Sequence, residues 1–142
     1  MMINQYKNMK TNYYRISLVA LLLLALHACT KGPGEGGRAS IKGTIFARNY
    51  SNSFAVIDSG LIGGQKVYIK YGDEPGISDD TDTDQNGEFY FNFLREGKYT
   101  LIVYSKQLIN NTLDSAVVKQ VEITSRNQQL VVPQIDINLL KN

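Results

Sequence analysis

The sequence has few of the residues on which most catalytic and metal chemistry depends. Its 142 residues include one cysteine (Cys29), one histidine (His27), three prolines and no tryptophan. A single cysteine excludes an internal disulfide, and zinc sites built from several Cys or His ligands are excluded as well. Any nucleophile that relies on a histidine base would depend on His27 alone.

An excess of charge is also absent. Fifteen basic and thirteen acidic residues give a formal net charge of +2. Three of the basic residues, Lys7, Lys10 and Arg15, lie in the first 28 residues, so 12 basic and 13 acidic residues remain beyond them. A nucleic-acid-binding protein needs a basic surface. We therefore expect no nucleic-acid partner.

The N-terminal region has the pattern of a signal peptide. Its basic start contains no acid, and residues 16–28 form an apolar run of about the length of a signal core, 7 to 15 residues. This run is shorter than the roughly 20 residues that a membrane-spanning helix needs. It ends in Leu26-His27-Ala28-Cys29, which resembles the lipobox of bacterial lipoproteins. The resemblance implies cleavage before Cys29 and a diacylglycerol thioether on Cys29, usually with a further amide-linked acyl chain such as palmitate.

An ordinary secretory signal, leaving Cys29 as a free thiol, is the alternative, although Ala25 and His27 fit its cleavage pattern poorly. Two or three acyl chains would hold the protein on a membrane. Thr30 follows the cysteine, whereas Asp commonly marks inner-membrane retention in Gram-negative lipoproteins. We therefore expect an outer-membrane anchor, with the leaflet left open. Because cleavage would remove His27 and acylation would block Cys29, we expect no enzyme activity.

The sequence predicts three parts: a signal peptide over 1–28, a lipidated cysteine with a flexible tether over 29–38, and one domain over 39–142. Thr30 to Gly37 is rich in glycine, a composition typical of flexible linkers. Beyond it, apolar residues alternate with period two, as in strands, and no amphipathic helix is indicated. The rows that we expect to face the core are Ile41, Gly43, Ile45; Val67, Ile69, Tyr71; Phe89, Phe91, Phe93; Tyr99, Leu101, Val103; Val117, Val121, Ile123; and Ile135, Ile137, Leu139.

A short edge strand around Phe54, Val56 and Ile57 brings the count to about seven strands. Asn86-Gly87 is a hairpin signal, because both residues tolerate positive φ. Pro133 should lie at an edge, a bulge or a strand entry, since it cannot donate to a ladder. We therefore predict an all-β protein, an antiparallel β-sandwich of about seven strands.

Four segments together resemble the carboxypeptidase regulatory-like domain, a transthyretin-like β-sandwich. They are Ile41–Ile45, Gly64–Ile69, Thr83–Phe89 and Gly97–Leu101. The resemblance covers roughly residues 39–140. It implies a non-catalytic accessory or interaction module, and it carries over no catalytic residue.

Acidic residues are concentrated between Asp73 and Glu88. Residues 82–87 begin like a calcium loop, with oxygen-bearing side chains at alternate positions and a glycine at the sixth. Phe93 occupies the twelfth position, where an EF-hand needs glutamate, so an EF-hand is excluded. A looser calcium site is one reading, with Asp80, Asp82, Asp84 and Asn86 as ligands. The other is a charged strand edge that resists aggregation, with Asp84 and Asn86 shaping a hairpin. A paired-carboxylate hydrolase is disfavoured, because one such acid needs an apolar setting.

Three tyrosines, Tyr68, Tyr90 and Tyr104, fall on the faces opposite the apolar rows of their strands. They are candidates for a face that stacks on a sugar, and ordinary cross-strand aromatic pairing is the alternative. The leading hypothesis is a lipid-anchored, non-enzymatic envelope module with a structural or protein-interaction role and an envelope protein as partner. The second is a surface module that binds a glycan or peptide through these tyrosines. The third is calcium-stabilised adhesion, and no other cofactor is expected.

Overall fold

The computed structural model describes residues 31–107 and 113–140. The signal peptide predicted over 1–28 and the lipidated residue Cys29 lie outside the described residues. The chain divides into two units, Met1–Lys31 and Gly32–Asn142, and the second contains the fold discussed below. Within the described ranges, there is no apolar helix of membrane-spanning length.

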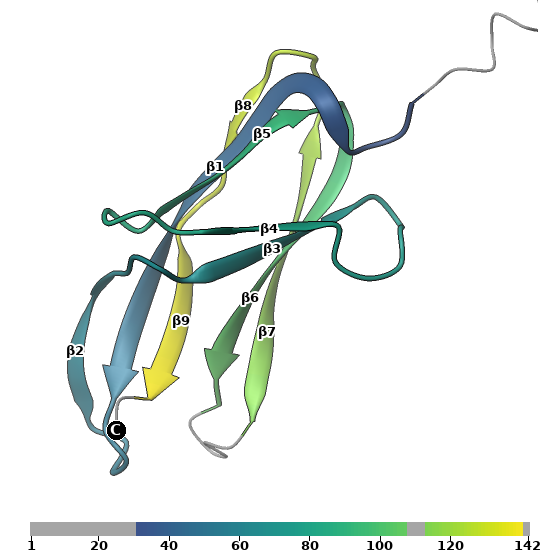
Figure 1. Ribbon diagram of the computed structural model, residues 1–142. Helices are drawn as coiled ribbons and strands as arrows, with labels where there is room; N and C mark the ends of the chain where they lie inside the picture. The colour runs from purple at the N-terminus through teal and green to yellow at the C-terminus, as the bar shows by residue number, and fades with distance from the viewer. Residues whose placement is uncertain (1–30, 108–112, 141–142) are drawn as a thin grey trace, which may run out of the picture. The chain divides into compact units, whose positions relative to one another are not determined.

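The second unit is all-β, as predicted, and its described residues contain nine strands (Figure 1). They are β1 (Glu35–Tyr50), β2 (Val56–Leu61), β3 (Lys66–Tyr71), β4 (Asp79–Asp82), β5 (Glu88–Leu94), β6 (Gly97–Lys106), β7 (Asp114–Ile123), β8 (Gln129–Val131) and β9 (Ile135–Leu140). The two strands beyond the predicted seven are β4 and β8. Both are short, and β4 consists of Asp-Asp-Thr-Asp, which has no apolar alternation.

The first sheet is organised around the long strand β1. Along one side of β1, β5 and then β2 pair with it antiparallel. Along the other side, β8 and then β9 pair with it in parallel. The β-sandwich is confirmed, but these two pairings are parallel, whereas antiparallel strands were predicted. Pro133 lies between β8 and β9, so it does not have to donate to the ladder, as expected.

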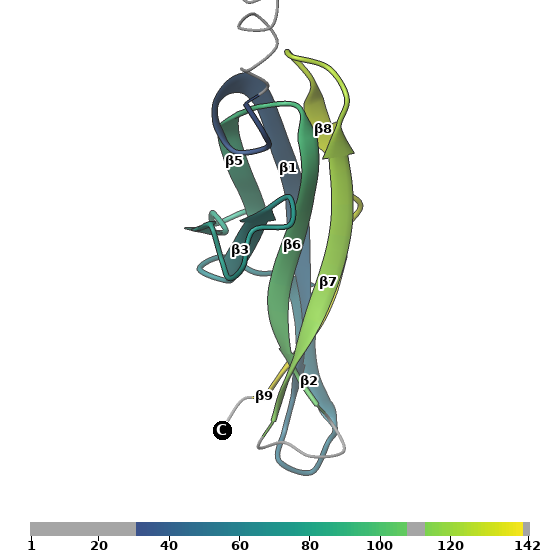
Figure 2. The same cartoon turned by 90° about the vertical axis from the view of Figure 1, so that its right-hand side faces the viewer.

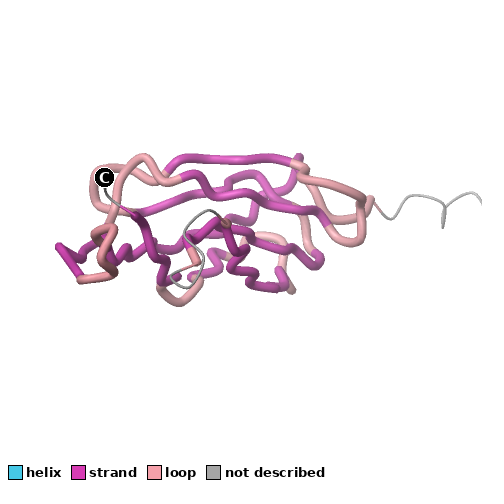
Figure 3. Tube along the Cα trace, turned by 90° about the horizontal axis from the view of Figure 1, so that it is seen from below, coloured by secondary structure: helices cyan, strands magenta, loops and turns pink. Residues whose placement is uncertain are grey.

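The second sheet has the order β4-β3-β6-β7 and is antiparallel throughout. The two sheets form the two layers of a sandwich, which Figure 2 and Figure 3 show from two directions. Inward side chains from both sheets make one core. Its largest fully buried members are Tyr99, Phe89, Ile41, Ile45, Ile69 and Leu94. Most of the alternating rows predicted from the sequence thus do face the core.

Phe93 is the exception. We expected it to be buried with Phe89 and Phe91, but its side chain is 73% exposed. A bulge explains the difference, because Ala39 of β1 pairs with Leu94 and Ile41 pairs with Phe91, so that three residue steps on β5 lie opposite two on β1. Phe93 takes a φ of 59°, and the extra residue turns Leu94, in place of Phe93, toward the core.

The glycine-rich segment also differs from the expectation. The flexible tether was predicted to extend to Arg38, whereas β1 begins at Glu35 and residues from Gly32 onward pack against the sandwich. Here the glycines allow the backbone of this segment to lie close to its neighbours. A Cβ on Gly37 would lie 1.8 Å from the carbonyl oxygen of Leu94, and Gly34 has a φ of 138°. A glycine-rich composition is typical of a linker, but here the glycines are needed for tight packing.

The Asn86-Gly87 turn joins β4 in one sheet to β5 in the other, so it does not close a simple hairpin. Gly87 has a φ of 74°, but Asn86 does not adopt positive φ as expected. The amide of Gly87 donates to the carbonyl oxygen of Asp84 at 3.0 Å. This is the geometry of a three-residue loop that ends in a left-handed glycine.

Candidate functional site

The outer face of the β4-β3-β6-β7 sheet carries the best candidate site. Tyr68 on β3 lies opposite Ile102 on β6, and Ile102 lies opposite Val118 on β7. Tyr104 is two residues along β6, so it shares this face. We call these four residues, Tyr68, Ile102, Tyr104 and Val118, the tyrosine face.

The two tyrosines of this face are in contact. Their ring centroids are 5.7 Å apart, with an angle of 75° between the ring planes, so the rings meet edge to face. Tyr104 is 45% exposed and Val118 is 50% exposed. An edge-to-face pair stabilises both rings while leaving one ring face open to a ligand. The tyrosine face is therefore an ordered apolar surface in contact with water.

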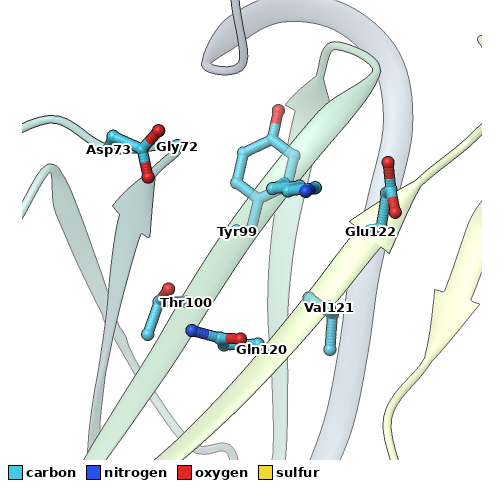
Figure 4. A pocket seen from close by; sticks show the side chains of 8 residues that line it. Gly72, Asp73, Tyr99, Thr100, Gln120, Val121 and Glu122 are labelled. Atoms are coloured by element: carbon cyan, nitrogen blue, oxygen red, sulfur yellow. The ribbon is translucent and has the colours of Figure 1, made fainter.

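A hollow of about 370 Å³ continues the same face toward the start of β6 (Figure 4). Its residues are Gly72, Asp73, Lys98, Tyr99, Thr100, Gln120, Val121 and Glu122. Thr100 lies opposite Gln120, and Lys98 lies opposite Glu122. The hollow thus brings hydroxyl, amide, ammonium and carboxylate groups together beside the apolar tyrosine face.

Tyr90, the third predicted member, is not part of this face. It lies on β5 in the other sheet, opposite Lys42 of β1. Its hydroxyl donates to the carboxylate of Glu88, and this hydrogen bond is the main cause that raises the pKa of Tyr90. The prediction that Tyr68, Tyr90 and Tyr104 form one patch is wrong, because β3 and β5 belong to different sheets.

The acidic candidates for calcium have other partners. Asp80 and Asp82 share the outer face of β4 with Lys66 of β3. The ammonium group of Lys66 donates to Asp80 and lies 3.2 Å from Oδ1 of Asp82. These two hydrogen bonds raise the pKa of Lys66. A lysine therefore occupies the position between the carboxylates where a cation would bind.

Asp84 has a role in the turn. Its Oδ1 accepts hydrogen bonds from the backbone amides of Asn86 at 2.8 Å and Glu88 at 2.9 Å. The sequence offered this role, in which Asp84 and Asn86 shape the turn, as the alternative to a calcium site. In residues 31–107 and 113–140, no group of three or more His, Cys, Asp or Glu side chains is placed to hold a metal ion.

Sequence reasoning missed part of this site. Val118, Thr100 and Gln120 reach it only through the β6 and β7 register, which the amino-acid pattern does not reveal. The signal for Ile102 was present, since it alternates with the buried row of β6. Pairing the outward rows of adjacent strands could have found the tyrosine face.

Two comparisons with known proteins give a match. Residues 64–130, under half of the chain, match the family model for polysaccharide lyase family 4, domain II. A crystal structure of a proposed carbohydrate-binding protein from Pseudomonas aeruginosa is 21% identical, covers 76% of this chain and 91% of its own, and has a TM-score of 0.40. No curated protein matches.

Proposed function

We propose that this protein is a lipid-anchored, non-catalytic module of the bacterial cell envelope that binds a neutral glycan on the tyrosine face and in the adjoining hollow. In this proposal the signal peptide over 1–28 is removed and Cys29 is acylated at the outer membrane. The sandwich that follows presents the binding surface. The observation that carries the proposal is the contact between Tyr68 and Tyr104 beside a hollow lined with polar groups.

Glycans need two kinds of contact from a protein. Their apolar C–H faces pack on aromatic rings, and their hydroxyl groups need donors and acceptors that fix orientation. The tyrosine face supplies the first contact. Thr100 and Gln120, opposite each other on β6 and β7, supply the second.

The charges around the site favour a neutral ligand. Lys66 is paired with Asp80 and Asp82, and Lys106 is paired with Asp114 at 2.7 Å. Lys98 lies opposite Glu122 across the hollow. Because these cations have acidic neighbours, the face has no excess charge to attract an acidic polymer.

The non-catalytic part of the proposal is supported by the residue types. Cleavage before Cys29 removes His27, and acylation consumes the thiol, so the mature domain has neither His nor a free Cys. The paired carboxylates of the outer face, Asp80 and Asp82, are exposed and bound to Lys66. Neither has the apolar setting of a catalytic acid.

The carboxypeptidase regulatory-like resemblance remains part of the proposal. Its four segments occupy β1, β3, the turn from β4 to β5, and the start of β6. These are the strands and the turn that build the core of the sandwich.

Affinity electrophoresis in gels that contain galactan, xylan or glucomannan tests the glycan site. We expect one neutral polysaccharide to retard the protein, and Tyr104→Ala to weaken binding by about tenfold or more, equivalent to about 1.4 kcal/mol. Tyr90→Ala, on the other sheet, is the matched control and should bind normally. Equal losses in both variants, or no retardation in any gel, would contradict the proposal.

Membrane fractionation tests the anchor separately. Cys29→Ser should move the protein out of the outer-membrane fraction or leave its leader uncut. A Cys29→Ser protein that is processed and stays in that fraction would show that the lipid is not the anchor.

A protein partner is the second candidate, and the edge strand β2 favours it. Among the described strands, β2 pairs only with β1, and its Val56, Ile57 and Leu61 are more than half exposed. A partner strand could add to this edge. Crosslinking in intact cells should then recover one dominant envelope protein, and Ile57→Lys should abolish the crosslink while leaving glycan binding intact.

Thermal denaturation tests the alternative hypothesis of calcium stabilisation. If it holds, millimolar calcium raises the melting temperature, and an Asp82→Ala, Asp84→Ala double variant loses this rise. Because Lys66 already neutralises Asp82, we expect no rise. A clear shift in the wild type alone would restore the calcium site.

A further inference from the structure

The start of the sandwich is fixed by a clamp on Gly32, Pro33 and Gly34. The amide of Gly34 donates to the hydroxyl of Tyr99 at 2.9 Å, and the carbonyl oxygen of Gly34 accepts from the amide of Arg95 at 2.9 Å. The guanidinium of Arg95 donates to the carbonyl oxygen of Gly32 at 3.1 Å. The hydroxyl of Tyr99 in turn donates to the carbonyl oxygen of Arg95 at 2.7 Å.

Pro33 completes the clamp. Its ring lies in a slot where a Cβ on Gly97 would come within 2.8 Å and a Cβ on Gly72 within 3.1 Å. Only Thr30 and Lys31 separate Cys29 from Gly32. Even fully extended, this stretch spans at most about 11 Å between the Cα atoms of Cys29 and Gly32. A lipid on Cys29 would therefore hold this end of the sandwich close to the bilayer surface.

The same end exposes Phe93. The bulge that displaces it is anchored on Leu94, directly beside the clamp residue Arg95. A phenylalanine at a φ of 59° costs free energy, and a ring that is 73% exposed gains little from burial to offset that cost. The fold thus holds an aromatic side chain outward, at the end from which the chain leads back to Cys29.

Two exposed arginines lie at this end. Arg38 lies in the β1 segment that bulges around Leu94, and Arg126 lies in the turn between β7 and β8, whose Gln128 carbonyl oxygen accepts from the amide of Ser40. Both side chains are exposed, and neither forms an ion pair within the described residues. The acids of this end are Glu35, Glu96 and Glu122, near in the chain and the sheet pairing, and Asp73 and Glu74, which follow the slot residue Gly72. Asp79 lies near Tyr71, which packs on the clamp residue Tyr99, while Asp80, Asp82 and Asp84 lie further along β4 and in the turn that follows it.

We propose that this end of the sandwich docks on the membrane, with Phe93 in the interfacial layer and Arg38 and Arg126 against anionic headgroups. Aromatic rings and arginine side chains are suited to this layer, since each has an apolar body and a polar or charged part. Acidic lipids attract basic residues near the surface. The inference rests on the acylation of Cys29, which belongs to the proposed function. It adds that the domain has a fixed orientation, standing on its clamped end.

Fluorescence on vesicles tests the docking, and the absence of tryptophan from the chain makes each variant a single-tryptophan protein. The lipidated Phe93→Trp protein is reconstituted into phosphatidylethanolamine and phosphatidylglycerol vesicles that contain brominated acyl chains. We expect quenching of about twofold or more, and less in vesicles of phosphatidylcholine alone. Tyr104→Trp, on the tyrosine face, is the control and should not be quenched.

The outcomes separate this inference from the proposed anchor. The docking is overturned if the tryptophan of the Phe93→Trp protein is as exposed to water and as little quenched as the tryptophan of the Tyr104→Trp protein. This conclusion holds even when radiolabelled palmitate is incorporated and the protein stays on vesicles. A chain that incorporates no palmitate and does not associate with vesicles would overturn the anchor, and the docking with it. A Phe93→Trp signal that is buried but unquenched by brominated lipid would show a protein contact in place of the membrane, which also overturns the inference.

Discussion

The two ends of the sandwich share one feature and differ in what maintains it. Each end exposes a phenylalanine in the left-handed region, Phe93 with a φ of 59° and Phe54 with a φ of 62°. Around Phe54 the bonds are local, since Ser51 and Ala55 pair with each other and Phe54 donates to the Ser51 carbonyl oxygen. Around Phe93 the contacts come from distant parts of the chain, through the clamp and the β1 register.

This difference shows that the same backbone conformation can have two origins. Phe54, in the turn between β1 and β2, adopts this conformation because the turn closes within five residues. The bulge at Phe93 adopts it because residues more than fifty positions away impose a register. We therefore expect variants at the clamped end to have larger effects on stability than matched variants at the hairpin end or on the outer face.

Removal of the Tyr99 ring should have the largest effect. Tyr99 is fully buried and bonds to Gly34 and Arg95. Tyr99→Ala should lower the free energy of unfolding by about 3 to 5 kcal/mol, measured by urea denaturation. Tyr99→Phe, which keeps the ring and loses the bonds, should cost about 1 to 2 kcal/mol. Tyr104→Ala is the exposed control, and an equal loss there would contradict the clamp.

Gly37→Ala comes next. The added Cβ would collide with the backbone at Leu94 and Arg95, which cannot rotate away, so we expect a loss of about 3 kcal/mol. Gly60 on β2 has nothing within 4 Å of the position that an added methyl group would occupy, and Gly60→Ala should gain about 0.5 kcal/mol. Equal effects in thermal denaturation would remove the distinction between the two ends.

Alkaline pH should weaken the clamped end, where the Tyr71 ring packs edge to face on the ring of the clamp residue Tyr99. Burial, with the nearby charges of Asp79 and Glu35, raises the pKa of Tyr71 to about 12, above the value of about 10 in the unfolded chain. Its contribution to stability is therefore complete below pH 10 and is lost as the pH rises from 10 to 12. In urea denaturation, Tyr71→Phe should lose less stability over this interval than the wild type. A Tyr71→Phe profile identical to the wild type would contradict this assignment.

The smallest effects should come from replacing the two phenylalanines that adopt left-handed φ values. Phe54→Asn and Phe93→Asn should each raise the free energy of unfolding by about 1 kcal/mol, because asparagine tolerates the left-handed region and adds no exposed ring. Urea denaturation measures both. A loss at Phe54 would show that its ring packs on the hairpin, and a loss at Phe93 would show that the bulge needs the ring.

Much of the fold could be predicted from the sequence, because alternation of apolar residues reports which side chains face a core. The rows of β3, β6 and β9 were identified in this way. Phe93 could not be, because a bulge shifts the alternation by one residue and its cause lies in β1. The parallel pairing of β1 with β9 leaves no mark in the alternation either.

The candidate site was half predictable for the same reason. Tyr68 and Tyr104 were identified as outward-facing, but only the sheet order shows that they touch and that Tyr90 lies elsewhere. The glycine-rich segment was misread because glycine serves both flexible linkers and close packing. Composition cannot separate these two uses, and the contact of Gly37 with Leu94 does.

The pairing of β1 with β9 has a consequence for how the chain folds. The first and last strands lie side by side, and the ion pair between Arg48 and Asp136 joins residues 88 positions apart. Non-local pairing of this kind slows folding, since a long loop must close before the contacts form. The central strand therefore stays incomplete until β9 has been synthesised. A chain that ended before β9 would leave β1 without this neighbour from Ile45 to Tyr50.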